Sequence, residues 1–229
     1  FIIPLLNSPG FTAPDKKILI MYPSQRGMPW YENLHGIFQE SFKNSPGMHI
    51  NTEFEYLDLM RNQNAEYKHI LFNLLNKKYS GKKYDLIITM NESLDFLRNE
   101  GKTLFPGVPV IFSSSALYAE KIDQKKENLS GIVHDEQKSM VLGTLESALK
   151  LLPDTKNVVI ISGIDETSRY RELEARKAYS PYEQTITFIW LSGKPMDEIL
   201  DNIKKLEDDT IIIYFFMITD GAGKNFIPI

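Results

Sequence analysis

The sequence predicts an α/β fold of two doubly wound lobes, each a parallel sheet with helices on both faces. Short runs of β-branched and aromatic residues alternate with longer segments of helical period from residue 16 onward, and this order occurs twice. Continuous apolar strands separated by helices are typical of parallel sheets buried on both faces. The chain has 229 residues, which favours two lobes of roughly 100 residues each over one compact domain.

Residues 16–112 contain the first series of elements. Apolar residues such as Leu34 and Phe38 form a stripe that predicts a helix over residues 31–43. Apolar residues also recur at i, i+3 and i+4 from Tyr67 to Leu75, which predicts a helix that stops at Ser80-Gly81. A third helix is predicted at 92–99, and strands at 18–22, 51–58, 86–89 and 108–112.

The second series begins after Gly131-Ile-Val133, where we expect the chain to cross and the lobes to hinge. Helices are predicted at 136–152, 167–179 and 196–206, and strands at 158–162, 185–191 and 211–217. The expected organisation is a tail over 1–15, a first lobe over 16–132 and a second lobe over 133–229. Because this series stops after a strand and a glycine-rich turn, we expect the second lobe to be incomplete.

Composition excludes several classes of function. The net charge is −4, with 26 basic and 30 acidic residues mixed along the chain, so a nucleic-acid partner or an anionic membrane surface is not expected. The absence of cysteine excludes thiolate catalysis, iron–sulfur clusters and disulfides. No apolar run approaches the about 20 residues that span a bilayer, so any membrane contact is expected through segments outside this chain.

Ligands of open parallel sheets bind beyond the carboxyl ends of the strands. The residues at those ends carry mainly hydroxyl, amide, acid and aromatic groups, which predicts a hydrogen-bonding cleft with aromatic walls. The candidate ligand-binding residues are Tyr22, Ser24, Arg26, Trp30, Asn91, Glu92, Ser113, Ser114, Ser115, Asp135, Asp165 and Phe216. Two simpler interpretations stay open: Trp30 would attach a helix to the sheet, and Ser114 or Ser115 would cap a helix.

Signatures of catalysis are missing from the sequence. No G-x-G-x-x-G follows a strand, no G-x-S-x-G is present, and Gly221-Ala-Gly223-Lys-Asn lacks the length and the Ser/Thr of a P-loop. The four histidines do not pair at metal-ligand spacing. Tyr22-Pro23 and Met90-Asn91 stand where a phosphoacceptor domain needs acids. We therefore expect a protein that is not an enzyme and holds no cofactor or metal.

Several stretches, taken in order, resemble one known family over nearly the whole chain from Lys16. They are Gly27-Met-Pro-Trp30, Gly36-Ile37, residues 78–88 (KYSGKKYDLII), residues 104–112 (LFPGVPVIF), Gly131-Ile-Val133, Phe215-Phe216, Asp220-Gly-Ala-Gly223 and Phe226-Ile-Pro228. This ordered set resembles the ABC-transporter substrate-binding-like family. The similarity is greatest to the extracytoplasmic sensor domains of bacterial sensor histidine kinases.

The resemblance implies a periplasmic-binding-protein-like clamshell, in which two Rossmann-like lobes joined by a hinge close over a small molecule. In a sensor, closure would pass a signal to a membrane-anchored output module such as a histidine kinase of a two-component system. We therefore expect a periplasmic or extracytoplasmic sensor domain, and homodimerisation through the full-length receptor stays open. The alternatives are a free substrate-binding protein of an ABC transporter, a pure interaction module, and a two-lobed enzyme such as a glycosyltransferase or epimerase.

The predicted cleft suits an amino acid or a small organic acid. Arg26, or the helix start near residues 113–115, would bind a carboxylate, an acid such as Glu92 would bind an ammonium group, and Trp30 or Phe216 would contact an apolar body. A sugar is expected to need more Asn, Asp and Trp around the cleft. A metal would need clustered histidines or carboxylates.

Overall fold

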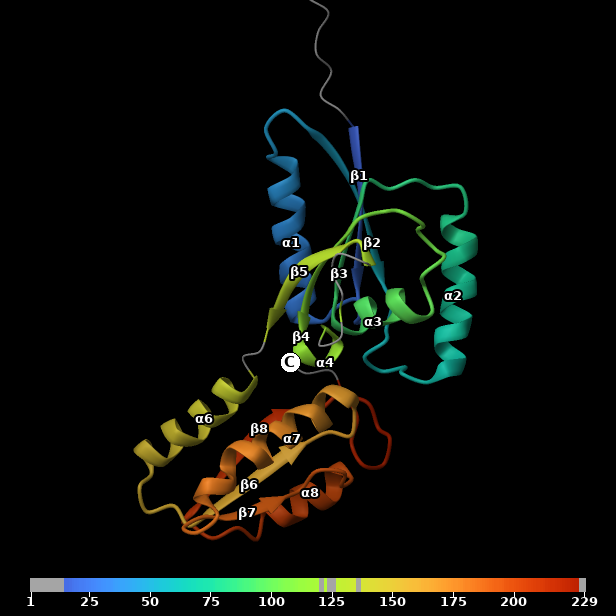
Figure 1. Cartoon of the computed structure of the whole chain (residues 1–229). Coiled ribbons are helices and arrows are strands. Elements are labelled where there is room, and N and C mark those ends of the chain that lie inside the picture. Colours follow the sequence, from blue (N-terminus) through green and yellow to red (C-terminus); the bar gives the residue numbers. More distant parts are fainter. Residues whose placement is uncertain (1–14, 120–121, 123–126, 135–136, 227–229) are drawn as a thin grey trace, which may run out of the picture.

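The computed structural model describes residues 15–119, 122, 127–134 and 137–226, and it confirms the predicted α/β class. The described strands form a five-stranded sheet and a smaller three-stranded sheet, and all their pairings are parallel. The two sheets belong to two lobes that lie one above the other (Figure 1). Within the described part of the chain, no helix is both long and apolar enough to span a bilayer.

The first sheet has the strand order β2-β1-β3-β4-β5. Its strands are β1 (Asp15–Tyr22), β2 (His49–Tyr56), β3 (Leu86–Met90), β4 (Val110–Ser115) and β5 (Leu129–His134). The helices of this lobe are α1 (Pro29–Lys43), α2 (Ala65–Tyr79), α3 (Asn91–Asn99) and the short α4 (Ala116–Ala119). The first four strands and the first three helices agree with the sequence prediction.

The fifth strand is the one strand of the described residues that the sequence pattern did not predict. Residues 131–133, expected to be the crossover between the lobes, lie inside β5 and pair with residues 112–114 of β4. The expected boundary after residue 132 therefore falls within a strand of the first sheet. The described part of the second lobe begins with α6 (Gln137–Leu151).

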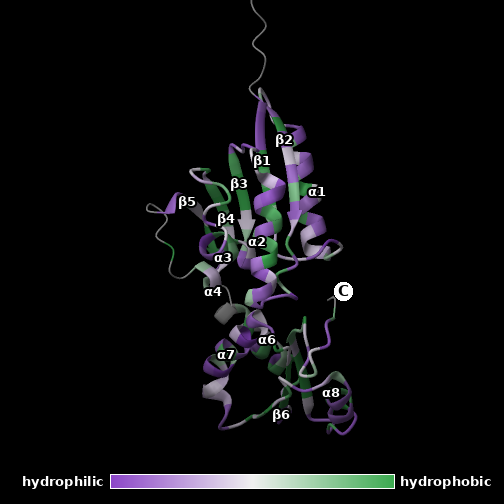
Figure 2. Cartoon of the chain, turned by 90° about the vertical axis from the view of Figure 1, so that its right-hand side faces the viewer, coloured by the Kyte–Doolittle hydropathy of each residue, from purple (hydrophilic) through white to green (hydrophobic). Residues whose placement is uncertain are grey.

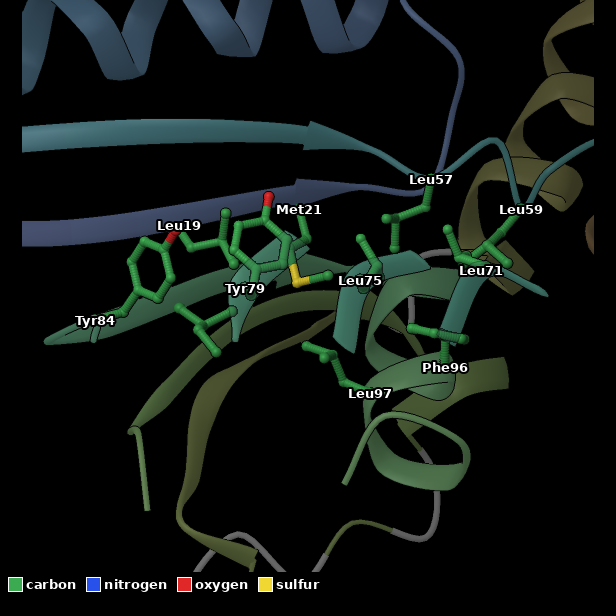
Figure 3. Close-up of a cluster of buried hydrophobic side chains, with 11 residues drawn as sticks. Leu19, Met21, Leu57, Leu59, Leu71, Leu75, Tyr79, Tyr84, Phe96 and Leu97 are labelled. Atoms are coloured by element: carbon green, nitrogen blue, oxygen red, sulfur yellow. The ribbon is translucent and has the colours of Figure 1, made fainter. Parts of the chain in front are cut away.

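Helices cover both faces of the first sheet because its central strands are apolar on both sides. Alternate residues of β1 point to opposite faces. Ile18 and Ile20 belong to the buried cluster that includes Tyr31 of α1, whereas Leu19 and Met21 belong to the cluster under α2 and α3. Figure 3 shows this second cluster, in which Leu75 of α2 lies close to Met21.

The second sheet has the order β7-β6-β8, with β6 (Asn157–Ser162) between β7 (Thr187–Trp190) and β8 (Thr210–Phe216). Its further helices are α7 (Glu166–Tyr179), the 3-10 turn η1 (Ser180–Tyr182) and α8 (Met196–Ile203). Residues of α6 and α7 share a buried cluster with Val158 and Ile160, and Ile199 of α8 shares one with Val159 and Ile161. Figure 2 shows hydrophobic residues concentrated in the strands of both lobes.

The lobes meet at the carboxyl ends of their strands. The strands of the first sheet run toward the second lobe (Figure 1). Ile218, which follows β8 of the second lobe, is 1% exposed and belongs to the same buried cluster as Tyr22 and Met90 of the first lobe. The ends of both sheets therefore border one shared space, where ligands of parallel sheets bind.

Candidate functional site

Two adjoining cavities lie between the lobes. The first has a volume of about 380 Å³ and is lined by Met28, Pro29, Trp30, Tyr31, Met60, Asn91, Glu92, Thr167, Arg171 and Phe216. The second has a volume of about 430 Å³ and is lined by Trp30, Asn91, Ser115, Leu117, Tyr118, His134, Met140, Thr167, Tyr170 and Arg171. Each cavity is lined by residues of both lobes, and both volumes lie in the usual range for small-molecule sites.

Asn91 lies at the junction between β3 and α3 and lines both cavities. It has a positive φ of 44°, a left-handed conformation that asparagine tolerates better than most residues. Its side-chain Oδ1 accepts a 3.0 Å hydrogen bond from the backbone N–H of Ser115 at the end of β4. The turn after β3 is therefore attached to the neighbouring strand, and the next residue, Glu92, is held at the lobe boundary.

Glu92 is a buried carboxyl group that joins the two lobes. It is 8% exposed, and its Oε1 accepts a 2.9 Å hydrogen bond from the Tyr118 hydroxyl of the first lobe. The hydroxyl of Thr167, in the first turns of α7, donates to the same atom at 3.3 Å. Burial raises the pKa of Glu92 above its ordinary value, because the charged form loses its hydration.

Arg171 supplies a cation from the second lobe. Its Cζ atom lies 5.0 Å from the centroid of the Phe216 ring, within the range of a cation–π contact. Burial lowers the pKa of the Arg171 guanidinium, and the nearby Asp165 and Glu92 carboxyl groups oppose this shift. An arginine side chain stays charged in proteins despite such shifts, so Arg171 places a positive charge at both cavities.

Apolar and aromatic groups form the remainder of the first cavity. Met28, Tyr31 and Met60 are buried, and Phe216 is half-buried at the end of β8. Trp30 is 67% exposed, although it lines both cavities. A large ring that stays in solvent at the edge of a pocket is available to cover a bound molecule.

Five of the sequence-predicted residues line these cavities. Trp30, Asn91, Glu92 and Phe216 line the first cavity, and Trp30, Asn91 and Ser115 line the second. Ser113 lies beside the second cavity, since its hydroxyl is 2.7 Å from Nε2 of His134, which lines it. The strand ends of both sheets thus bring half of the candidate set to the lobe boundary.

Three candidates at the end of β1 lie elsewhere. Tyr22 is fully buried, with its ring centroid 5.0 Å from that of Tyr56 and 5.5 Å from that of Tyr31. Ser24 is also buried, and neither its hydroxyl nor that of Tyr22 has a hydrogen-bond partner within the described structure. Arg26 is exposed on the loop before α1 and does not line either cavity as described.

The other candidates have structural surroundings or are not described. Ser114 is buried in β4, and its hydroxyl donates to the carbonyl of Ser115 at 3.2 Å. Asp165 caps α7 by accepting from the N–H of Ser168 at 2.9 Å, and it also accepts from the Ser168 hydroxyl at 2.7 Å. Asp135 lies outside the described residues.

The strongest polar contributions from the second lobe were missed by the sequence reasoning. Thr167 and Arg171 are four residues apart on α7, so they lie on one face of the helix near its start. Both residues lie on a helix face and not directly after a strand, where ligand-binding residues were expected. The spacing of Thr167, Tyr170 and Arg171 directly after a strand–loop junction was the signal that could have found them.

The two cavities combine a few polar and charged side chains with a mainly apolar lining. Within the described residues, no group of three or more His, Cys, Asp or Glu side chains is arranged to hold a metal ion. Glu92 is the one carboxyl group among the described residues of the two cavities, and Arg171 is the one arginine or lysine. The arrangement can bind a small molecule through a guanidinium, a carboxyl group and an apolar surface.

No family model matches the chain, and a search of curated proteins finds no match. Solved structures are similar to it. The ABC domain of Streptococcus pneumoniae in complex with L-Trp has a TM-score of 0.54 at 15% identity, covering 91% of this chain and 68% of that one. A periplasmic ribose ABC transporter structure from Conexibacter woesei has a TM-score of 0.58 at 15% identity, covering 90% of this chain and 65% of that one.

The fructose-binding periplasmic domain of a hybrid two-component system has a TM-score of 0.52 at 13% identity, covering 87% of this chain and 63% of that one. This chain thus spans only about two thirds of the length of each of these structures. At such identities the similarity establishes the fold alone. It agrees with the two parallel sheets and the cavities between them, and the chain therefore has the two-lobed fold of periplasmic binding proteins.

Proposed function

We propose that this chain is a ligand-binding domain that holds a small molecule between its two lobes. The observation that carries the proposal is the pair of cavities lined by both lobes, with the buried Glu92 hydrogen-bonded to Tyr118 on one side and Thr167 on the other. A ligand at this boundary would contact both lobes at once. It would thereby change the relative stability of open and closed arrangements.

The role that we propose is that of an extracytoplasmic sensor domain, anchored through segments outside this chain and coupled to an output module such as a histidine kinase. The similarity to the periplasmic domain of a hybrid two-component system supports this role. The alternative is the free substrate-binding protein of an ABC transporter, which the similarity to the ribose transporter structure supports. A transmembrane helix with a kinase module in the full-length protein would decide for the sensor.

We infer binding and not catalysis as the task of the cavities. General acid–base chemistry of the glycosidase or epimerase type uses at least two groups with separated pKa values. Glu92 is the one carboxyl group among the described cavity residues, and hydroxyl groups from both lobes hydrogen-bond to it. Such a group suits the recognition of a ligand or the joining of the lobes.

The ligand that we propose is an amino acid or a small organic acid. Arg171 takes the part of the carboxylate-binding cation, which sequence reasoning gave to Arg26, because Arg171 lines both cavities. The similar structure from Streptococcus pneumoniae was solved with L-Trp, which supports an amino acid. The other two structures are named for ribose and fructose, so sugars are the alternative ligands against which amino acids should be tested.

A combined melting and scattering experiment tests the proposal. Amino acids, organic acids, sugars and nucleosides would be screened for a rise in Tm, since a ligand at about 100 times its Kd adds roughly 2.7 kcal/mol to the free energy of unfolding. We expect the stabilising ligand to reduce the radius of gyration in X-ray scattering, because the lobes of a clamshell approach each other. Identical scattering curves with and without a saturating ligand would contradict the closure of the lobes.

We propose that the two lobes are the moving parts, and that residues 133–134 of β5 move with the first lobe and not with the predicted second lobe of residues 133–229. We propose that the rotation occurs on the carboxyl side of β5, after the stretch 131–133 that the sequence favoured. Ladder hydrogen bonds between β4 and β5 hold residues 131–133 in the first sheet. A hinge absorbs its change in φ and ψ in a few residues of a loop or at the end of an element, and not inside a paired strand.

A further inference from the structure

We propose that the first cavity selects an aromatic α-amino acid, with the ligand carboxylate on Arg171, its ammonium group on Glu92 and its ring between Trp30 and Phe216. The inference rests on the proposed function, because it assigns the ligand class of the same site. It goes further by naming the residue for each part of the ligand. Two of the four residues, Arg171 and Phe216, come from the second lobe, and two come from the first.

The polar groups of the cavity fit a zwitterion, since a bound ammonium group would favour the charged form of the buried Glu92 carboxyl. The described lining contains one cation, Arg171, and one carboxyl group, Glu92. A ligand with two carboxylates would place its second negative charge beside Glu92 without a second cation, and a diamine would place a positive charge beside Arg171. Unpaired charges in a partly buried site cost several kcal/mol or more, so the lining disfavours both classes.

The position of Arg171 fits the recognition of a carboxylate next to an aromatic ring. Its guanidinium lies over the Phe216 ring at 5.0 Å. Arginine donates two parallel hydrogen bonds to a carboxylate, and the planar group can do so through its edge while its face stays on a ring. Carboxylate recognition by Arg171 therefore keeps Phe216 in place as part of the ring-binding surface.

Glu92 accepts side-chain hydrogen bonds from both lobes on the same carboxyl oxygen. The Tyr118 and Thr167 hydroxyl groups both donate to Oε1. We assign Oε2 as the acceptor for the ligand ammonium group. Because Tyr118 belongs to the first lobe and Thr167 to the second, the orientation of this carboxyl group depends on how the two lobes meet.

The remaining lining requires a ligand with a large apolar body. Met28, Pro29, Trp30, Tyr31, Met60 and Phe216 account for most of the ten residues around the first cavity. Methionine sulfur atoms and aromatic rings both make favourable contacts with a bound aromatic ring. A sugar of similar size would leave several hydroxyl groups against these apolar side chains without partners, which costs binding free energy.

Calorimetric titration of the whole chain tests the ligand class. L-phenylalanine and L-tryptophan are the probes, and each comparison compound removes one feature: 3-phenylpropionate lacks the ammonium group, phenethylamine lacks the carboxylate, and L-alanine lacks the ring. We expect at least one probe to bind and each comparison compound to bind about tenfold more weakly or worse, because each leaves a cavity group unpaired or unfilled. Equal binding of 3-phenylpropionate and L-phenylalanine would overturn the role of Glu92.

Matched variants test the residues. We expect Arg171→Gln and Glu92→Gln each to weaken binding of the better probe about tenfold or more. Arg169→Gln and Glu40→Gln are the controls, because both residues are exposed, on α7 and α1 respectively, and lie outside the described lining of the cavity. Unfolding curves of all four variants would verify that each is folded. Unchanged affinity in a folded Arg171→Gln variant would overturn the carboxylate assignment.

The two proposals fail in different ways. If ribose, fructose or a nucleoside raises the Tm and closes the lobes while the aromatic amino acids do not bind, the ligand class is wrong and the binding function stands. If no compound of the four classes changes the Tm or the scattering, both proposals are wrong. If an aromatic amino acid binds with unchanged affinity in a folded Phe216→Leu variant, the ring is held elsewhere and the assignment of Phe216 is wrong.

Discussion

The hydroxyl of Tyr118 donates a 2.9 Å hydrogen bond to Oε1 of Glu92, and both residues are buried where the two lobes meet. Thr167 of the other lobe donates to the same oxygen and lies 3.2 Å from the Tyr118 hydroxyl. A single carboxyl oxygen thus collects hydroxyl groups from both lobes. This relationship makes Glu92 the residue through which ligand binding, lobe contact and pH are expected to be coupled.

The Tyr118→Phe substitution is expected to lower the free energy of unfolding by about 1–3 kcal/mol. It removes a donor from a buried carboxyl group and leaves Thr167 at 3.3 Å as the other hydroxyl donor. Tyr179→Phe is the matched control, because its buried hydroxyl donates to a neutral acceptor, the carbonyl of Val141, at 3.1 Å. Urea unfolding of both variants is the measurement, and a larger loss in Tyr179→Phe would contradict the role given to Tyr118.

The free energy of unfolding of the Glu92→Gln variant is expected to increase relative to that of the wild type as the pH rises. Because burial raises the folded-state pKa of Glu92, the folded protein keeps this proton at pH values where the unfolded chain has lost it. The free energy of unfolding of the wild type then falls with rising pH between the two pKa values, by at most about 1.4 kcal/mol per pH unit. Glutamine at position 92 has no proton to lose, so this decline disappears.

The measurement is the difference in free energy of unfolding between wild type and Glu92→Gln, from about pH 4 to about pH 8. Taking the difference cancels carboxyl groups with lowered pKa values, such as Asp85, whose contribution to stability is lost as the pH falls. Glu40→Gln is the control, since Glu40 is exposed on α1. A difference that moves in favour of the wild type as the pH rises would show that Glu92 is stabilised as a carboxylate.

The alternation of apolar strands and amphipathic helices predicted the fold class, but it did not reveal the fifth strand. Strands such as β3 and β6 are recognisable because their residues are buried on both faces. β5 lies at the sheet edge, contains Gly131, and leaves Ile132 66% exposed. A short run of this kind has no periodicity that separates an edge strand from a connection.

Trp30, Asn91 and Phe216 were correctly expected at the lobe boundary because they follow the carboxyl ends of strands. That position does not predict which way a side chain points. Tyr22 shares a sheet face with Ile18 and Ile20 by the period of two, and its ring accordingly joins the core under α1. Arg171 lies on a helix with many charged residues, where a cation is typical of a solvated face. Its position at the cavity depends on how the two lobes meet, which local sequence does not encode.

The Gly131→Ala substitution is expected to destabilise the protein by about 1–3 kcal/mol, because the added methyl group has no room. An ideal Cβ at Gly131 would lie 2.1 Å from the carbonyl oxygen of Phe112 and 2.7 Å from Cγ of its ring. Phe112 is 1% exposed beneath α3 and α4, so it cannot move aside without disturbing Leu94 and Leu129 of the same cluster.

Gly143→Ala is the control for that substitution. Gly143 lies inside α6, and a Cβ there meets nothing within 4 Å apart from the helix's own backbone. Alanine is preferred to glycine inside a helix by about 0.5–1 kcal/mol, so this variant should be more stable than the wild type. Thermal unfolding of both variants is the measurement, and a Gly131→Ala variant as stable as the wild type would contradict the tight packing of β5 on β4.

The Trp30→Phe substitution is expected to remove most of the change in tryptophan fluorescence that a non-fluorescent ligand produces, for which L-phenylalanine is the first choice. Trp30 lines both cavities while 67% exposed, so a ligand that fills either cavity changes the solvation of the indole ring. The chain has two tryptophans, and Trp190 lies in β7 with the guanidinium of Arg176 3.9 Å from its ring centroid. Trp190→Phe is therefore the matched control and should keep the ligand-induced change. A Trp30→Phe protein that retains the full change, or a Trp190→Phe protein that loses it, would place the ligand away from the cavities beside Trp30.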